Sequence, residues 1–147
     1  MEKQAIINCI FILCGIPGSG KSTLAAELTE TYKAKLYSYD DIIYNSKKKP
    51  EDVRAYILSS IKEDLQEGFN VVMDDSNILI KLRTEVLAAI NECESKKILI
   101  VMDTPLNICL LRNANRKKRL PDWVIHHMYR KYQVPTLDEG MDEILYY

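Results

Sequence analysis

The segment with the clearest chemistry is Gly-Ile-Pro-Gly-Ser-Gly-Lys-Ser at positions 15–22, which lies between an apolar run and a helical stretch. Its glycines allow a tight turn in which backbone N–H groups point at one anion, and the next helix adds partial positive charge. The lysine of this pattern reaches the β- and γ-phosphates of a nucleotide, and the serine is a ligand for Mg²⁺. We therefore expect a nucleoside triphosphate site, although a glycine-rich turn without a ligand has the same pattern. The expected contacts are Gly15, Pro17, Gly18, Ser19, Gly20, Lys21, Ser22 and Thr23.

Two adjacent acidic residues, Asp74 and Asp75, end a short apolar run and are the expected source of a magnesium ligand. A triphosphate needs Mg²⁺, which keeps several waters and takes one or two carboxylates. Ser22 and one of the two aspartates would complete this site, and the pattern does not choose between them. The same segment can instead cap a helix that starts near Ile78, because Asp, Ser and Asn are all common capping residues.

Asp40 follows the next predicted strand and is a candidate for the group that positions a phosphoryl acceptor. In kinases an aspartate orients the acceptor hydroxyl and takes its proton late, while alignment and charge neutralisation supply most of the catalysis. Asp40 can instead cap a short helix over residues 41–44. The basic run Lys47–Lys49 would either line the path of an anionic acceptor or form a solvated loop.

Seven basic residues and one acidic residue, Asp122, lie between positions 112 and 131. Arg112 and Arg116 are four residues apart, which places both on one face of a helix and lets both reach one cleft. Two guanidinium groups closing over a triphosphate would stabilise the charge on the transferring oxygens. A run of charges is usually a solvated helix face, and we interpret Lys117, Lys118 and Lys131 in this way.

Strand and helix signals alternate along the chain, which predicts an α/β fold with a mainly parallel sheet of four or five strands and helices on both sides. The expected strands are Ile6–Cys14, Lys35–Tyr39, Asn70–Met73, Lys97–Met102 and Glu143–Tyr146. The expected helices are Thr23–Tyr32, Pro50–Glu67, Ile78–Cys93, Pro105–Arg116 and Pro121–Tyr132. Ligands of such sheets bind beyond the carboxyl ends of the strands, so the phosphate loop and the aspartates are expected at one edge.

The bulk composition is that of an ordinary globular protein. The 147 residues suit a single domain, and the net charge of −1 argues against a nonspecific nucleic-acid coat. The 4 cysteines form no C-x-x-C pair and are expected to be reduced, buried thiols. The apolar run Ile6–Cys14 is too short to cross a bilayer and lacks a cleavage site, so we expect a cytoplasmic protein without membrane contact.

Together these residues resemble the kinase domain of the polynucleotide 5′-hydroxyl kinases over nearly the whole chain. The phosphate loop, Ser-Tyr-Asp-Asp-Ile at 38–42 and Asp-Asp-Ser-Asn at 74–77 are similar to segments of that family. Residues 112–116 are similar to the lid of the bacteriophage enzymes, and residues 128–144 resemble the end of the kinase domain in the animal repair enzymes. Two features depart from the pattern: Ile43 stands where the bacteriophage enzymes carry an arginine, and no Asp-x-Asp-Gly-Thr phosphatase motif follows.

The resemblance implies a P-loop NTPase fold, a three-layer α/β/α sandwich in one domain (1–147) with a small arginine-bearing lid at about residues 112–120. It implies transfer of a phosphoryl group from ATP, with Mg²⁺, to the 5′-hydroxyl end of DNA or RNA. The catalytic residues would be Lys21, Asp40, Arg112 and Arg116. By analogy with similar kinases, Pro135 and Thr136 would border the adenine.

Two other functions remain open at this point. The same scaffold could phosphorylate a small molecule or seryl-tRNA, or it could be a nucleotide-binding regulatory ATPase without an acceptor. The pairing of an acidic acceptor site with two lid arginines favours a kinase over such a switch. The sequence does not indicate protein partners.

Overall fold

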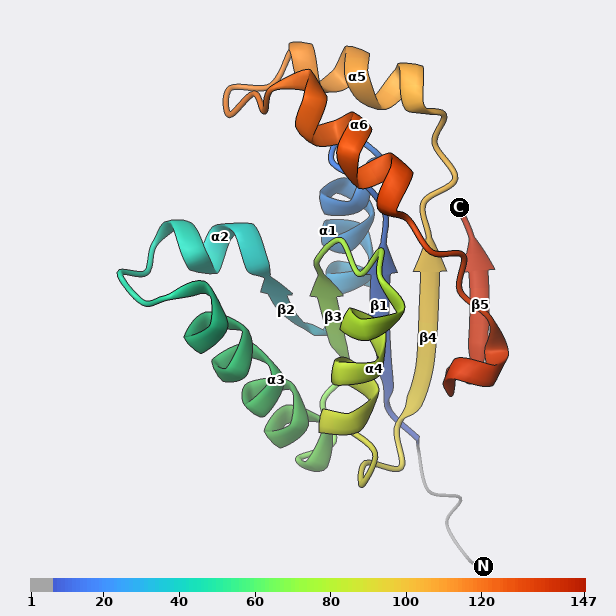
Figure 1. Ribbon diagram of the computed structural model, residues 1–147. Coiled ribbons are helices and arrows are strands. Elements are labelled where there is room, and N and C mark those ends of the chain that lie inside the picture. Colours follow the sequence, from blue (N-terminus) through green and yellow to red (C-terminus); the bar gives the residue numbers. More distant parts are fainter. Residues whose placement is uncertain (1–6) are drawn as a thin grey trace, which may run out of the picture.

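The computed structural model describes residues 7–147, and its centre is a sheet in which all neighbouring strands are parallel (Figure 1). The strand order is β2-β3-β1-β4-β5, so β1 lies in the middle and later strands are added on both sides. The strands are β1 (Cys9–Cys14), β2 (Lys35–Ser38), β3 (Val71–Asp74), β4 (Lys96–Val101) and β5 (Glu143–Tyr146). The helices are α1 (Lys21–Tyr32), α2 (Tyr39–Tyr44), α3 (Pro50–Gln66), α4 (Ile80–Ala89), α5 (Leu106–Ala114), α6 (Asp122–Lys131) and the 3₁₀ helix η1 (Leu137–Glu139).

The central strands are apolar runs because both of their faces are covered. Residues 10–14 of β1 and all of β3 are buried, whereas the edge strands β2 and β5 are partly exposed. Successive side chains of β1 point to opposite faces. Ile10 and Ile12 belong to the core under α3 and α4, and Phe11 and Leu13 belong to the core under α1.

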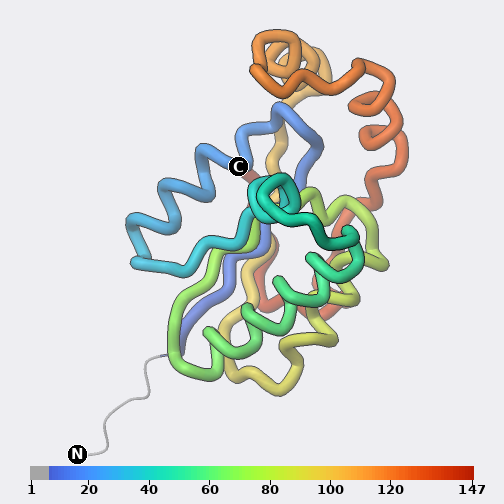
Figure 2. The backbone as a smooth tube through the Cα atoms, turned by 90° about the vertical axis from the view of Figure 1, so that its left-hand side faces the viewer, coloured from blue at the N-terminus to red at the C-terminus, as the bar shows by residue number. Residues whose placement is uncertain are grey.

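Helices cover the two faces of the sheet, with α1 on one side and α3 and α4 on the other (Figure 2). The length of α3 follows from an apolar stripe with helical spacing. Tyr56 also has the spacing of this stripe, but its side chain is 54% exposed and lies at the edge of a groove. The buried residues of the stripe are Val53, Ile57, Ile61 and Leu65.

The helices α5 and α6 lie above the carboxyl ends of the strands (Figure 1). A small apolar cluster joins them to the phosphate loop and to the segment after β3. Because this cluster is buried, it fixes the two helices over the edge of the sheet where the predicted site residues lie. Its members are Ile16, Ile78, Cys109 and Ile125.

The predicted fold class is confirmed, with five strands and a sheet that is entirely parallel. The predicted first strand began at Ile6, which lies outside the described residues. The helix predicted at 78–93 is shorter, because Asn77 adopts a positive φ of 48° and Leu79 is extended, and because Ile90 leaves the helical region. Among residues 7–147, no helix has the length and apolar character needed to cross a membrane.

Candidate active site

The phosphate loop, residues 15–22, connects β1 to α1 at the carboxyl edge of the sheet. Gly18 and Gly20 have φ angles of 83° and 96°, which other residues rarely adopt. A side chain at Gly18 would also collide with the carbonyl oxygen of Cys109 on α5, only 2.5 Å from the Cβ position. Close contact between the loop and α5 thus requires glycine here. Lys21 Nζ donates a hydrogen bond to the carbonyl of Ile16 at 3.0 Å, which holds its ammonium group against the loop.

A cavity of about 650 Å³ lies against this loop and collects residues from distant parts of the sequence. The end of β2 leads into Asp40, and the lid contributes Arg112 and Arg116. Burial lowers the pKa of Lys21, and the carboxylates of Asp74, Asp40 and Asp75 oppose this shift. A lysine-bearing anion cradle, carboxylates and two guanidinium groups therefore surround one space. The loop residues in its lining are Pro17, Gly18, Gly20, Lys21, Ser22 and Thr23.

The helix α2 separates this cavity from a second groove. One face of the helix lines the cavity, and the other face lines the groove. Spacings of three and four place residues on one helix face. The residues on the cavity side are Tyr39, Asp40, Ile43 and Tyr44. Those on the other side, Asp41, Ile42 and Asn45, line a groove of about 460 Å³ between β2, α2 and α3. The alternative that Asp40 caps the helix does not fit, because Ser38 occupies the capping position and Asp40 lies in the first turn.

Ser22 and Asp74 form the pair of oxygen donors that best suits Mg²⁺. The Ser22 hydroxyl donates a hydrogen bond to Asp74 Oδ2 at 2.9 Å, at the edge of the cavity. Burial raises the pKa of Asp74, while the Ser22 hydrogen bond and the Lys21 charge act in the opposite direction. Mg²⁺ needs only one or two such protein ligands, because water and phosphate oxygens complete its octahedron. The residues present therefore fit the ion that a triphosphate brings.

Asp75 has different partners from Asp74. Its Oδ2 accepts a hydrogen bond from Arg54 Nη1 at 2.9 Å, and its Oδ1 accepts one from the Ser76 N–H at 2.7 Å. Arg54 also binds Glu85 and the carbonyl of Leu82, so it connects α3 to α4. Both carboxylate oxygens of Asp75 are thus occupied by structural contacts. The alternative of helix capping by this segment does not fit either, since Leu79 stands at the capping position of α4.

We expect Asp74→Asn and Asp75→Asn to have separable effects. Asp74→Asn should raise the Mg²⁺ concentration for half-maximal activity by about tenfold or more, because it removes a charged oxygen beside Ser22. Asp75→Asn should leave this concentration unchanged and lower the free energy of unfolding by about 1–3 kcal/mol, because it weakens the Arg54 ion pair. Magnesium titrations and urea unfolding measure the two effects. The reverse pattern would assign the metal to Asp75.

A buried asparagine, Asn113, stands between the two lid arginines in the sequence. Asn113 is fully buried, and its side chain accepts a hydrogen bond from the Leu120 N–H and donates one to the Leu120 carbonyl. These bonds close the loop that follows α5, so the helix ends at Ala114 rather than at the predicted Arg116. Arg112 Nη1 donates to the Gly18 carbonyl at 3.3 Å, which brings the lid onto the phosphate loop.

The model of the family described as chromatin associated protein KTI12 matches residues 9–145. The chain belongs to the KTI12 family. It is 31% identical over 144 residues to the L-seryl-tRNA(Sec) kinase of Methanococcus maripaludis, across 90% of this chain and 56% of the relative. It is 27% identical over 148 residues to the bifunctional polynucleotide phosphatase/kinase of Schizosaccharomyces pombe, across 97% of this chain and 33% of the relative.

The chain thus spans about half and one third of the length of these two curated relatives. Its structure is similar to that of Chaetomium thermophilum Kti12 in complex with ADP-AlF3, with a TM-score of 0.73 and 14% identity over 94% of this chain and 88% of that chain. At this identity the likeness shows the fold alone. The comparisons establish the KTI12 family and a P-loop kinase fold, and they do not single out the polynucleotide kinases that the sequence resembles.

Several residues expected to contact ligands do not line the cavity of this KTI12-family chain. Thr136 caps η1, where its side chain and that of Glu139 form a reciprocal capping box, and Pro135 before it is buried. The structure therefore does not bring Pro135 and Thr136 to the expected adenine position. Gly15 and Ser19 lie inside the loop: Ser19 is buried, and its hydroxyl is 2.6 Å from where a Cβ of Gly15 would be. They shape the loop from within.

The lysine run at 47–49 also lies elsewhere. Of its members, Lys48 lines the second groove, and its ammonium group is 5.6 Å from the centroid of the Tyr56 ring. The expected path for an anionic acceptor along this run is therefore separate from Asp40. Lys118 is exposed, as expected, but it also lines the phosphate cavity of the KTI12-family chain, and its ammonium group lies 3.5 Å from the centroid of the Tyr44 ring. The sequence of a basic segment does not show which of its lysines will line a cavity and which will not.

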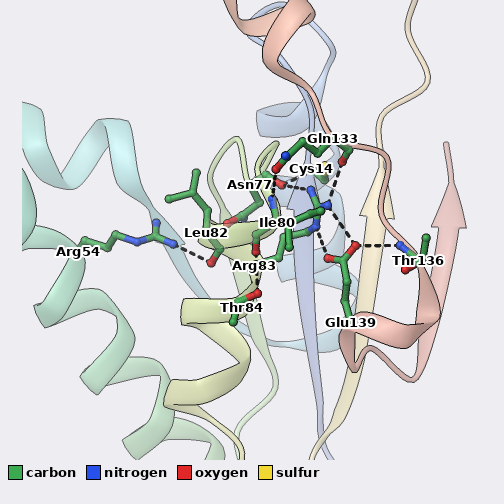
Figure 3. Close-up of polar contacts among 10 residues, drawn as sticks. All are labelled: Cys14, Arg54, Asn77, Ile80, Leu82, Arg83, Thr84, Gln133, Thr136 and Glu139. Atoms are coloured by element: carbon green, nitrogen blue, oxygen red, sulfur yellow. Dashed lines mark hydrogen bonds and ion pairs between the residues drawn. The ribbon is translucent and has the colours of Figure 1, made fainter.

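A buried arginine that the sequence did not reveal joins segments that are far apart in the chain (Figure 3). The Arg83 side chain is fully buried and binds both carboxylate oxygens of Glu139, at 2.7 and 3.2 Å. It also donates to the carbonyls of Asn77 and Gln133. Arg83 thus joins the segment after β3 to the segment after α6. The sequence pattern of α4 does not indicate that Arg83 is buried.

We expect Arg83→Met to destabilise the protein by about 3–5 kcal/mol, because it leaves the nearly buried Glu139 carboxylate unpaired. The double variant R83M/E139Q should recover part of this loss. Burial alone would raise the pKa of Glu139, but the hydrogen bonds from Arg83 and the Thr136 N–H outweigh it and lower the pKa. The pair therefore stabilises the fold above the ordinary Glu pKa of about 4.3 and is lost as the pH falls below it. Urea unfolding of wild type and Glu139→Gln between pH 7 and pH 3 should show the difference shrinking on acidification.

Proposed function

We propose that this KTI12-family chain is a kinase that transfers the γ-phosphoryl group of ATP to the 5′-hydroxyl end of DNA or RNA. One observation carries the proposal: Asp40 lines the same cavity as Lys21 and the two lid arginines. A regulatory nucleotide switch has no need for an acidic group opposite the phosphate loop. A kinase needs that group to orient an acceptor hydroxyl.

In this proposal the phosphate loop and Lys21 hold the triphosphate, and Asp40 accepts a hydrogen bond from the acceptor hydroxyl. A bond forms between the acceptor oxygen and the γ-phosphorus, and the bond from that phosphorus to the β–γ bridging oxygen breaks. ADP leaves with the bridging electron pair, and the hydroxyl proton passes late to Asp40. Arg112 and Arg116 stabilise the negative charge on the transferring oxygens.

Mg²⁺, held by Ser22 and Asp74, would neutralise charge on the β- and γ-phosphates. The chain's own contribution at this point is to fix the two oxygen donors beside Lys21. The Ser22–Asp74 hydrogen bond of 2.9 Å keeps them together.

A nucleic-acid end is the acceptor class that the surroundings of the cavity support best. Arg116 and Lys118 line the cavity and belong to the basic segment of the lid. Cations at the acceptor side favour a polyanionic acceptor over a neutral small molecule. The similarity to a polynucleotide phosphatase/kinase adds support of the same kind.

A second candidate, phosphorylation of the seryl group of seryl-tRNA, is favoured by the 31% identity to an L-seryl-tRNA(Sec) kinase over 90% of this chain. Its acceptor is likewise a hydroxyl attached to a nucleic acid. The proposed roles of Lys21, Asp40 and the lid arginines would be the same in both reactions.

An acceptor panel tests these alternatives. Purified protein is incubated with γ-labelled ATP and Mg²⁺, and with a single-stranded 5′-hydroxyl DNA or RNA oligonucleotide, a nucleoside, seryl-tRNA, or no acceptor. We expect label on the 5′-hydroxyl oligonucleotides, with a matched 5′-phosphorylated oligonucleotide as control. Label on seryl-tRNA alone would support the second candidate. ATP hydrolysis that is indifferent to every acceptor would overturn both and support a regulatory ATPase.

A further inference from the structure

Beyond its charged groups, the lining that α2 and the lid give to the phosphate cavity is apolar and aromatic. Its residues are partly exposed within the cavity, and they offer few hydrogen-bonding groups. A sugar or another polyol would lose its hydrogen bonds to water in such a place without replacing them. A flat, aromatic group has few such hydrogen bonds to lose and can pack against these side chains. The residues are Tyr39, Ile43, Tyr44, Leu120 and Met128.

Two aromatic residues of α2, Tyr39 and Tyr44, line the cavity. Tyr39 is partly buried against the core under α3 and α4, whereas Tyr44 is 71% exposed and free to stack. Tyr44 lies four residues after Asp40 on the same face of α2, which corresponds to about one helical turn. A group that stacks on Tyr44 would therefore be a neighbour of a hydroxyl aligned by Asp40. The ring is covered on one side by the ammonium group of Lys118, 3.5 Å from its centroid.

On the basis of the proposed function, we propose that Tyr44 stacks on the base of the acceptor nucleotide and that Lys118 then pairs with a neighbouring backbone phosphate. Both side chains gain when their contact with each other is replaced by these contacts with the nucleic acid. An aromatic ring gains more from a stacked base than from an exposed cation, and a lysine gains more from a phosphate than from a ring. The other lining residues would contact the base edge from the lid, in the case of Leu120, and from α6, in the case of Met128. Tyr44 is then a specificity-determining residue for an unpaired nucleotide.

The test uses steady-state kinetics with a single-stranded 5′-hydroxyl DNA oligonucleotide. Tyr44→Ala should raise the KM for this acceptor by about tenfold and leave the Kd for ATP unchanged, whereas Tyr44→Phe should behave as wild type. An oligonucleotide whose first residue lacks a base should be phosphorylated equally by wild type and Tyr44→Ala. Tyr56→Ala is a matched control, because Tyr56 is also exposed and lies beside a lysine but lines the other groove.

The outcomes separate the inference from the function on which it rests. If wild type phosphorylates the oligonucleotide but Tyr44→Ala has the same KM, Tyr44 does not hold a base and the inference is wrong. If Tyr44→Ala instead weakens ATP binding, the base at Tyr44 is the adenine of ATP, and the assignment to the acceptor is also wrong. If wild type does not phosphorylate the oligonucleotide at all, the proposed function fails first and the inference fails with it.

Discussion

Asp40→Asn is expected to lower kcat for phosphoryl transfer by about 10²-fold or more while the Kd for ATP stays within a few-fold of wild type. The amide can still form a hydrogen bond to the acceptor hydroxyl, but it cannot receive the proton as the new bond forms. Asp40 lines the cavity beside the phosphate loop, but it belongs to α2 and not to the loop that holds the nucleotide. ATP binding should therefore survive. Single-turnover transfer and nucleotide titration measure the two quantities.

The neighbouring residue provides the matched control. Asp41→Asn removes the same charge one residue further on, and Asp41 lines the groove on the opposite side of α2. Its kcat should stay within about threefold of wild type. If the two variants lose activity equally, the effect is a general loss of negative charge near α2. If neither loses activity, Asp40 does not orient the acceptor.

The layered fold could be predicted from the sequence because its central strands carry a simple signal. Residues 10–14 are buried on both faces and read as an unbroken apolar run, and the glycine-rich loop that follows them fixes the order of strand, loop and helix. The ends of elements were less predictable. The helix after β3 begins late because Asn77 is held by a hydrogen bond to the carbonyl of Leu13, a contact 64 residues away in the sequence.

The site, like the fold, contains residues that could be predicted from the sequence and residues that could not. Lys21, Asp40 and Arg112 could be placed in one cavity because each follows a strand end or stands in a known motif. Arg83 and Arg54 could not be recognised as buried or half-buried structural residues, because their partners come from other elements. Asp74 and Asp75 are equivalent in the sequence and differ in their partners, which are Ser22 for Asp74 and Arg54 for Asp75. The spacing of residues within one element does not show which residue of another element a side chain will contact.

Arg116→Ala is expected to lower kcat by about 10³-fold, equivalent to about 4 kcal/mol of transition-state stabilisation. Among residues 7–147, the Arg116 side chain has no hydrogen bond or ion pair, and it lines the phosphate cavity. Its guanidinium group can therefore turn to the γ-phosphate without breaking a protein contact. Arg112, by contrast, already binds the Gly18 carbonyl, so Arg112→Ala should weaken ATP binding as well as transfer.

Arg116→Lys distinguishes charge from geometry. If the planar guanidinium forms two bonds to the transferring oxygens, lysine should restore only a small part of the lost rate, because it is a point charge without that fork. Full rescue by lysine would mean that charge alone matters. Lys117→Ala, next to Arg116 but outside the cavity lining, should retain wild-type kcat. Since both residues stand in the same basic segment, a rate loss confined to position 116 can arise only from its place in the cavity.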